Sequence, residues 1–328
     1  MSPSDKAGRG WLLGVVTYGL IAIGVAGFLA RHWRAHHTVA LAIIAFSPYL
    51  MLAAAAALVI ALLRRRRIAA FLAAVVTAAG VGTQVPHFLS DDVPGNAVKV
   101  RVMTFNLRLG EADAAEVVRE VRKNRIELLM VEELSMTGLA KLVAAGIDKE
   151  LPYNQGKPGL LGPDGTGLWS RYPIQSGHMV KGLSFATPAA LVDVPGVTQP
   201  VYAVAMHPIG PRKASRYWAR DIASVPFILR AVPPGAVIVG GDFNATPDNV
   251  WFRAVLETPG YANAIDQAGS GPIRTYNAEH PLPLIAIDHV LTRGAVATDV
   301  RSVHISGSDH RAIIATVAIP RTAPDADR

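Results

Sequence analysis

The sequence predicts an α+β protein in which a sandwich of two β-sheets, flanked by helices, follows three long apolar helices. Residues 1–90 consist mainly of three apolar stretches. Residues 91–328 instead contain about seven short apolar or alternating runs, the pattern of strands, and few helical ones. Many strands with few helices are typical of two sheets packed face to face. We therefore expect a membrane domain over 1–90 and a second domain over 91–328.

The three apolar stretches lie at about residues 11–30, 38–63 and 68–89, and none contains an acidic residue, Lys or Arg. Each is long enough to cross the ~30 Å hydrocarbon core of a bilayer. A single run of this kind is also compatible with a buried core helix. Three in succession, separated by basic linkers, favour three transmembrane helices.

The basic residues of these linkers predict an orientation. Four consecutive arginines, 64–67, separate the second and third stretches, and such clusters mark the cytoplasmic side. The N-terminus is then cytoplasmic and residues 91–328 lie outside, although two arginines in the linker 31–37 mildly oppose this. If the first stretch were a cleaved signal peptide, the arginine cluster would still place the C-terminal domain outside. We expect a multi-pass protein of the cytoplasmic membrane.

The net charge of +7 belongs to the N-terminal part. Eight of the 32 Lys and Arg residues and one of the 25 acidic residues lie in 1–90, so residues 91–328 carry 24 of each sign. Non-specific nucleic-acid binding needs a positive field, so the sequence disfavours nucleic acid as a partner and predicts no particular oligomeric state. The chain has no cysteine, which excludes thiol nucleophiles, disulfides and Cys-ligated zinc.

The expected strands of the second domain are 98–107, 126–134, 166–174, 200–208, 235–244, 285–292 and 311–319. Two segments have helical spacing instead. Residues 111–124 place acids early and bases late, as the helix dipole favours, and 214–229 form the other helix.

Polar residues of a few types stand where these strands end. They are Asn106, Glu133, His207, Asp242, Asn244, Asp288, Asp309 and His310. Any one of them alone is adequately explained as a turn or capping residue. Together they are the set of side chains that divalent-metal hydrolysis requires.

Seven short motifs contain these residues: "TFNL" (104–107), "VEEL" (131–134), "WSRYPI" (169–174), "MHP" (206–208), "GDFNATPD" (241–248), "IDHV" (287–290) and "SDHRAI" (308–313). In type and order they resemble the endonuclease/exonuclease/phosphatase superfamily, which has the DNase I-like fold. The resemblance covers about residues 98–319. Its most specific part is the combination of "GDFNATPD" with a later "SDH".

The resemblance implies a Mg²⁺-dependent hydrolase of phosphoric esters or anhydrides, with Mn²⁺ as the alternative metal. Glu133 matches the superfamily's metal-binding glutamate, and Asn106 and Asp309 are expected to complete the metal shell. Magnesium prefers such oxygen ligands. Glu132 stands where relatives often have Gln, and the sequence leaves open whether it is a second ligand or merely exposed.

The resemblance also assigns catalytic roles. Asp242 is expected to orient or deprotonate the attacking water, and Asn244 to bind a phosphate oxygen. His310 matches the histidine that contacts the scissile phosphate, with Asp288 orienting it. His207 matches a second histidine that donates to a non-bridging oxygen or protonates the leaving oxygen.

Two positions near these residues need separate comment. The motif "MHP" stands where relatives more often have Thr-His, and Pro208 is expected to alter the following loop. His289, adjacent to Asp288, points to the opposite face of its strand and is expected to be structural.

The combination of N-terminal apolar helices with such a domain resembles VanJ-type membrane proteins of high-GC bacteria. That resemblance implies dephosphorylation of a lipid-linked substrate, undecaprenyl pyrophosphate, and a role in glycopeptide (teicoplanin) resistance. The alternatives are an extracytoplasmic nuclease and a sphingomyelinase-like phosphodiesterase. A non-enzymatic binding module is disfavoured, because every expected catalytic residue type is present.

Four basic residues follow His207 closely: Arg212, Lys213, Arg216 and Arg220. They form either a solvated helix face or, with Tyr217 and Trp218, a basic-aromatic lip at the site. Such a lip would hold a second phosphate or the lipid headgroups.

Overall fold

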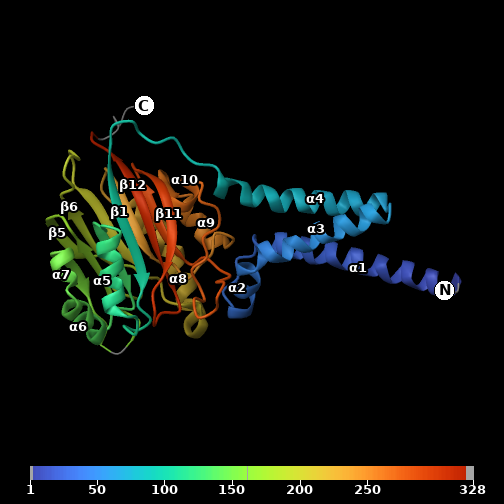
Figure 1. Ribbon diagram of the computed structural model, residues 1–328, viewed down its shortest axis with the longest axis horizontal. Helices are drawn as coiled ribbons and strands as arrows, with labels where there is room; N and C mark the ends of the chain where they lie inside the picture. Colours follow the sequence, from blue (N-terminus) through green and yellow to red (C-terminus); the bar gives the residue numbers. More distant parts are fainter. Residues whose placement is uncertain (1–2, 161, 323–328) are drawn as a thin grey trace. The chain divides into compact units, whose positions relative to one another are not determined.

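The computed structural model describes residues 3–160 and 162–322, which divide into two compact units (Figure 1). One unit consists of the chain up to Pro86 together with Asp248–Val250. The other consists of His87–Pro247 and the chain from Trp251 onward. Each unit is described by itself below.

The N-terminal unit is helical. Its helices are α1 (Pro3–Ala30), α2 (Thr38–Ala45), α3 (Ser47–Leu63) and α4 (Arg67–Gln84), and a short 3₁₀ turn, η1 (Val85–Phe88), follows α4. Glycines let α1 approach α3 closely, since a Cβ on Gly24 would lie 2.7 Å from the Ala54 Cβ and one on Gly27 would lie 2.7 Å from the Leu50 Cβ. Small residues at helix interfaces are typical of membrane helices.

Two helical segments, Gly10–Ala30 and Arg67–Phe88, are long and apolar enough to span a membrane. They correspond to the first and third predicted spans. The second predicted span, 38–63, is not one straight helix: α2 and α3 meet at Phe46 with a bend of 51°. Pro48 explains the break, because it has no N–H to donate to the Ile44 carbonyl of α2 and its ring clashes with that carbonyl, whereas proline is tolerated in the first turn of α3. The pair counts as a third span only if the bent helices cross together.

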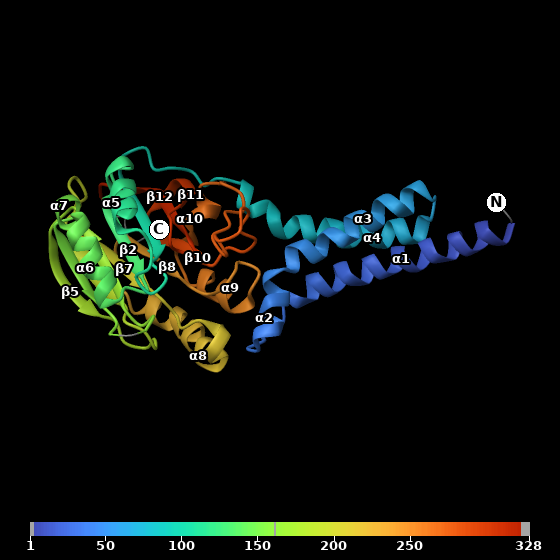
Figure 2. The ribbon, with the colours of Figure 1, turned by 60° about the horizontal axis from the view of Figure 1, so that its bottom comes forward.

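The second unit contains two six-stranded sheets (Figure 2). The first has the order β11-β12-β1-β2-β4-β3 and the second β5-β6-β7-β8-β10-β9. Each sheet has one parallel pair, β1 with β2 and β7 with β8, and its other pairs are antiparallel. The strands are β1 (Ala97–Asn106), β2 (Leu128–Glu132), β3 (Tyr153–Lys157), β4 (Thr166–Ser170), β5 (Ile174–Met179), β6 (Pro188–Val192), β7 (Val201–Met206), β8 (Val237–Asp242), β9 (Tyr261–Asn263), β10 (Asp288–Arg293), β11 (Val296–His304) and β12 (Arg311–Pro320).

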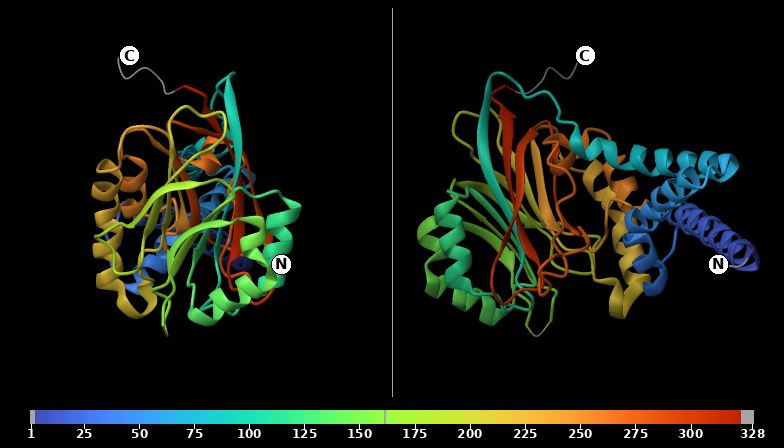
Figure 3. Two further views of the ribbon diagram at one scale, coloured as in Figure 1. Left: turned by 90° about the vertical axis from the view of Figure 1, so that its left-hand side faces the viewer. Right: turned by 45° about the vertical axis from the view of Figure 1, so that its right-hand side comes forward.

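Helices cover the outer faces of the sandwich. The helices are α5 (Ala114–Lys123), α6 (Met136–Ala145), α7 (Ile147–Glu150), α8 (Pro211–Arg230), α9 (Val250–Leu256) and α10 (Ala264–Gln267). Viewed from the side, α5 and α6 (green) lie outside one sheet and α8 (gold) lies outside the other (Figure 3). α5 begins at Ala114 rather than at residue 111, because the Asp113 side chain caps it by accepting from the Glu116 N–H.

Alternating side chains of the strands build two cores. Val102 of β1, Met130 of β2 and Ile238 of β8 are fully buried between the sheets. Phe105 of β1 faces the other way and packs in a second cluster with Val117 of α5. The period of two along each strand therefore directs every second residue of β1 and β2 into the sandwich.

The predicted two-sheet sandwich flanked by helices is confirmed, but the predicted number of strands is wrong. The seven expected strands are β1, β2, β4, β7, β8, β10 and β12, and β3, β5, β6, β9 and β11 were not predicted. β3 ("YNQGK") and β5 ("IQSGHM") are mostly exposed strands at sheet edges. Edge strands with little burial lack the apolar pattern by which strands are found.

Two consecutive glycines of β8 allow close packing at the end of the strand. A Cβ on Gly241 would lie 1.8 Å from the Met206 carbonyl oxygen of β7. A Cβ on Gly240 would lie 3.1 Å from the Met130 sulfur and 3.2 Å from the Thr104 Cβ, so these neighbours need to shift by only a few tenths of an ångström.

We therefore expect Gly241→Ala to lower the free energy of unfolding by about 3 kcal/mol or more, because two paired strands must separate. Gly240→Ala is the matched control and is expected to cost about 1 kcal/mol, since Met130 and Thr104 need to shift only slightly. Denaturant unfolding of the purified variants measures both. Equal losses at the two positions would contradict this explanation of the glycine pair.

Candidate active site

The predicted site residues gather at one end of the sandwich. β1, β2, β7 and β8 all end there, and the antiparallel strands β10 and β12 begin there. The register places Asn106 beside Glu132 and Asp242 beside Asp288. Residues far apart in the sequence therefore meet because each lies at the same end of its strand.

Asp242, Asp288 and His310 form the centre of the site. The His310 Nδ1 atom lies 2.9 Å and 3.1 Å from the two carboxylate oxygens of Asp288. Its Nε2 atom lies 3.7 Å from the Asp242 Oδ2, and the His207 Nε2 lies 3.7 Å from that same oxygen. All four residues are buried, so Asp242 stands between two imidazoles in a site shielded from solvent.

Burial and neighbouring charges shift these groups in different directions. Burial lowers the pKa of His310, but the nearby carboxylates of Asp288 and Asp242 outweigh it and raise that pKa to about 10. Burial raises the pKa of Asp242 to about 7, against the opposing effect of His310. Burial, assisted by the positive charge of His310, lowers the pKa of His207 to about 3. At neutral pH the site thus pairs a cationic His310 with a neutral His207.

Two asparagines hold the Asp242 carboxylate. The Asn106 Nδ2 donates to Oδ2 at 3.1 Å, and the Asn244 backbone N–H donates to Oδ1 at 2.8 Å. Asn244 has a φ of 51°, a left-handed conformation that asparagine tolerates. Its side-chain Nδ2 donates to the Pro208 carbonyl at 3.2 Å and lies 3.5 Å from the His207 Nε2. Pro208 of the "MHP" motif therefore supplies a carbonyl that positions Asn244.

The residues expected to bind metal lie beside this centre and differ in their hydrogen bonds. The Oε2 atom of the half-buried Glu133 accepts from the Leu109 N–H at 2.9 Å. The pKa of Glu133 is raised, mainly by burial. Hydrogen bonds from Asn106 and Leu109 oppose this effect, and the nearby carboxylate of Asp309 adds to it. The Asn106 amide oxygen accepts from the Arg108 N–H at 2.8 Å, so here it does not face outward as a metal ligand would.

Glu132 lies close enough to Asp288, Asp242 and His310 for their charges to act on it. It is fully buried, so the reading that it is merely exposed is wrong. Its Oε1 accepts from the Thr104 hydroxyl at 3.0 Å, whereas its Oε2 has no hydrogen-bond partner among the residues that the structure describes. Burial and the charge of Asp288 raise its pKa well above the ordinary value.

These groups fit a divalent cation. One possible ligand atom from each of Asp242, Asp288 and His310 lies within 4.8 Å of the others, but His310 is cationic and hydrogen-bonded to Asp288, so the carboxylates are the groups suited to face a cation. Burial raises the pKa of Asp242, Glu132 and Glu133, and a nearby cation would stabilise their charged forms. Carboxylate oxygens are ligands that suit Mg²⁺. The compact cluster differs from the ligand set that the sequence predicted, of which Glu133 and Asp309 lie near it.

The structure places three of the four expected basic lip residues at the surface. Trp218, expected beside them in the lip, is instead fully buried. The exposed Arg212 donates to the Tyr276 hydroxyl at 3.4 Å, and Arg216 and Arg220 lie exposed on α8. The Lys213 side chain lies outside the described residues. The ring of Tyr276 lies 4.9 Å from that of His310, so Tyr276 belongs to the site rim.

Sequence reasoning missed Tyr276 because it lies in a loop without strand or helix signals. It also missed Phe185, whose ring lies 5.1 Å from that of His207. His289 is confirmed as a packing residue: its Nε2 lies 2.9 Å from the Ala245 carbonyl oxygen, and its ring stacks on Phe252.

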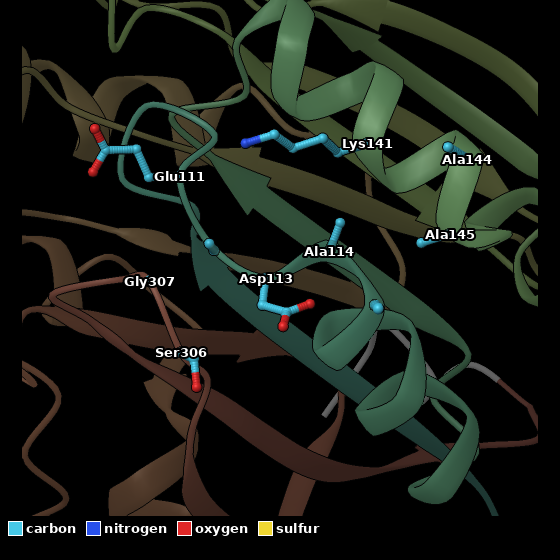
Figure 4. Close-up of a pocket in the computed structure, with 10 residues that line it drawn as sticks. Glu111, Asp113, Ala114, Lys141, Ala144, Ala145, Ser306 and Gly307 are labelled. Atoms are coloured by element: carbon cyan, nitrogen blue, oxygen red, sulfur yellow. The ribbon is translucent and has the colours of Figure 1, made fainter.

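A separate surface pocket lies between α5 and α6 (Figure 4). It is lined by Glu111, Asp113, Lys141 and Ser306, among others, and contains none of the predicted site residues. The Lys141 ammonium donates to the Gly110 carbonyl at 3.0 Å. This pocket is therefore distinct from the centre around Asp242.

Solved structures with the same fold share little sequence with the chain. A humanized D. rerio TDP2 is 16% identical with a TM-score of 0.57, over 67% of this chain and 98% of that one. The endonuclease/exonuclease/phosphatase from Beutenbergia cavernae is 18% identical with a TM-score of 0.56, over 70% and 73%. The corresponding protein from Bacteroides vulgatus is 14% identical with a TM-score of 0.52, over 67% and 98%. No match was found among curated proteins.

These similarities establish the DNase I-like fold of the second unit. The profile of the Endonuclease/Exonuclease/phosphatase family matches residues 103–310, more than half of the chain. That range includes every predicted catalytic and metal-binding residue from Asn106 to His310. The chain therefore belongs to the Endonuclease/Exonuclease/phosphatase family, whose members are generally phosphoesterases and nucleases.

Proposed function

We propose that this chain is a membrane-anchored, divalent-metal-dependent phosphohydrolase that acts outside the cytoplasmic membrane. The observation that carries the proposal is the buried cluster of Asp242, Asp288 and His310 at the strand ends of a family domain. Two helical segments of the same chain are apolar enough to span a membrane. A phosphate-cleaving site and candidate anchors thus occur in one polypeptide.

The side chains support distinct chemical roles. Asp242 has a pKa of about 7, suited to accepting a proton from water near neutral pH. The cationic His310 offsets negative charge on the phosphate, and Asp288 orients its ring. His207 remains neutral, which favours donation to a phosphate oxygen over full proton transfer to the leaving group.

We assign metal binding to Glu133, Asn106 and Asp309, next to the Asp242 cluster. Asn106 would turn its amide oxygen from the Arg108 N–H toward the cation. A bound Mg²⁺ supplies Lewis-acid stabilisation of charge on the phosphoryl oxygens. Mn²⁺ meets the same ligand requirements and is the alternative metal.

The proposed substrate is a lipid-linked pyrophosphate such as undecaprenyl pyrophosphate, from which the enzyme releases phosphate. Residues 91–328 carry equal numbers of acidic and basic residues and so lack the overall field that attracts nucleic acid. Membrane anchoring raises the local concentration of a lipid substrate. By the resemblance to VanJ-type proteins, we further propose a role in resistance to glycopeptides such as teicoplanin.

Phosphodiester cleavage is the second candidate. One structural neighbour is a D. rerio TDP2 complexed with single-strand DNA product, 15% identical with a TM-score of 0.54. That likeness supports a nuclease as the second candidate, and a sphingomyelinase-like phosphodiesterase is the related alternative.

The proposed function is tested by phosphate release from the purified full-length protein in lipid nanodiscs containing a polyprenyl pyrophosphate. We expect release with Mg²⁺, its loss in EDTA, and recovery when Mg²⁺ is added back. Asp242→Asn is expected to stay inactive throughout. Full activity in EDTA would refute the metal-dependent mechanism.

The proposed topology predicts the behaviour of reporter fusions. Alkaline phosphatase fused after residue 328 should be active, because three crossings from a cytoplasmic N-terminus place the C-terminus outside. The matched control, fusion after Arg66, should be inactive. An inactive C-terminal fusion would show that the bent pair of α2 and α3 does not cross as one span.

A further inference from the structure

The outward face of α8 combines arginines with exposed aromatic side chains. Arg216, Arg220, Phe227 and Arg230 recur at helical spacing and are exposed, and Tyr217 lies beside them. Phe227 is 71% exposed and Tyr217 is 58% exposed. Single exposed apolar side chains are normal in proteins, but a contiguous group of them marks an interaction surface.

The opposite face of α8 shows that this exposure is not loose packing. Trp218, Ile222, Val225 and Leu229 are fully buried against the second sheet. Asp221 is the only acid of the helix and is also buried, where it accepts from the Ser184 hydroxyl at 3.0 Å. The outward face therefore carries positive charge without an exposed acid of its own helix.

The arginines and aromatics of this face are paired. The Arg220 guanidinium lies 5.3 Å from the Tyr217 ring centre, and that of Arg230 lies 5.8 Å from the Phe227 ring centre. A cation over an aromatic ring keeps its charge while covering part of the ring. Such pairs suit an interface in which a charged layer lies directly above an apolar one. The Arg220 guanidinium also pairs with the buried Asp221 carboxylate at 3.3 Å, so Arg216 and Arg230 supply the net positive charge of this face.

An apolar groove widens this face beside Phe227. Its lining includes Phe227, Ile228, Met179, Val180 and Lys181. Lys181 adds a further exposed cation on the segment after β5. The patch thus offers apolar side chains bordered by basic groups.

We propose that the outward face of α8 docks on the surface of an anionic lipid bilayer. The basic residues match anionic headgroups, and the aromatic side chains suit the interfacial layer beneath them. The candidate spans of the same chain support a bilayer as the partner. The inference rests on one part of the proposed function, namely that the second unit works beside a membrane.

α8 leads directly from the loop after His207, so docking would place the active-site rim near lipid headgroups. The face extends the four-residue lip along the whole helix and adds Phe227 and Arg230. Basic residues are concentrated on one helix of a domain that has no net charge. An anionic lipid surface therefore attracts this side of the domain more strongly than the others.

The test measures how close α8 lies to lipid in the full-length protein reconstituted into vesicles. Because the chain has no cysteine, Ala231→Cys at the exposed end of α8 accepts one fluorescent label and leaves Phe227 intact. Arg119→Cys is the control, an exposed position on α5 outside the other sheet. Headgroup-attached nitroxide lipids quench labels that lie near the bilayer surface.

We expect severalfold stronger quenching at position 231 than at 119 in vesicles of phosphatidylcholine with phosphatidylglycerol. Pure phosphatidylcholine, or the combined variant R216Q/R230Q, should remove most of the difference. Equal quenching at the two positions, or no dependence on anionic lipid, would overturn the proposal. A larger response of the position-231 label to single-stranded DNA than to anionic lipid would replace it with nucleic-acid binding. None of these fluorescence measurements depends on catalytic activity.

Discussion

Glu133→Gln is expected to cut turnover on the order of 10³-fold at saturating Mg²⁺ while leaving the fold intact. Glutamine keeps the size of the side chain and the acceptor for the Leu109 N–H but loses the negative charge that a divalent cation requires. Lewis-acid stabilisation by a bound metal is worth several kcal/mol, and each 1.36 kcal/mol is about tenfold in rate. The measurements are kcat and Mg²⁺ affinity, by steady-state kinetics and calorimetry.

The matched control for this variant is Glu111→Gln, which removes the same charge from an exposed side chain near the site. Glu111 pairs with Arg108 at the surface, where ion pairs contribute little. We expect its kcat and Mg²⁺ affinity to match those of the unmodified protein. Unchanged turnover of Glu133→Gln would remove Glu133 from the metal site.

Changes to the Asp288–His310 pair should be equally severe and non-additive. His310→Gln removes the imidazolium that faces the Asp242 oxygen, and Asp288→Asn removes the carboxylate that sustains it. Each is expected to lower kcat by roughly 10²–10⁴-fold. The double variant should be little worse than either single one, because the pair acts as one unit.

A kinetic double-mutant cycle measures this coupling. His289→Gln, at the neighbouring histidine, is the contrast: it should lower the melting temperature, because the buried ring packs on Phe252. Independent, multiplicative losses from Asp288→Asn and His310→Gln would contradict the proposed pairing.

Much of the fold could be predicted, because the central strands are buried on both faces. Runs such as Val237–Val239 are continuous and apolar, the pattern of a fully buried strand. Edge strands such as Tyr153–Lys157 make few buried contacts, so their sequences carry no such pattern. The break at Phe46 was also missed, since hydropathy records length and composition but not the local effect of Pro48.

The members of the site were predictable, but the contacts among them were not. Each polar residue at a strand end is visible in the sequence, and the two-sheet topology brings those ends together. Side-chain direction depends on the packed environment, so the sequence did not reveal that Asn106 donates to Asp242 or that Glu132 is fully buried. Tyr276 reaches His310 from a loop, where no periodicity indicates a position.

The most direct test of the central claim compares kcat/KM for a polyprenyl pyrophosphate and for single-stranded DNA, using one preparation of the full-length protein with Mg²⁺. The account predicts much faster phosphate release from the lipid, and loss of that activity in Asp242→Asn. Faster degradation of DNA than phosphate release from the lipid would contradict it and identify the chain as a membrane-anchored nuclease.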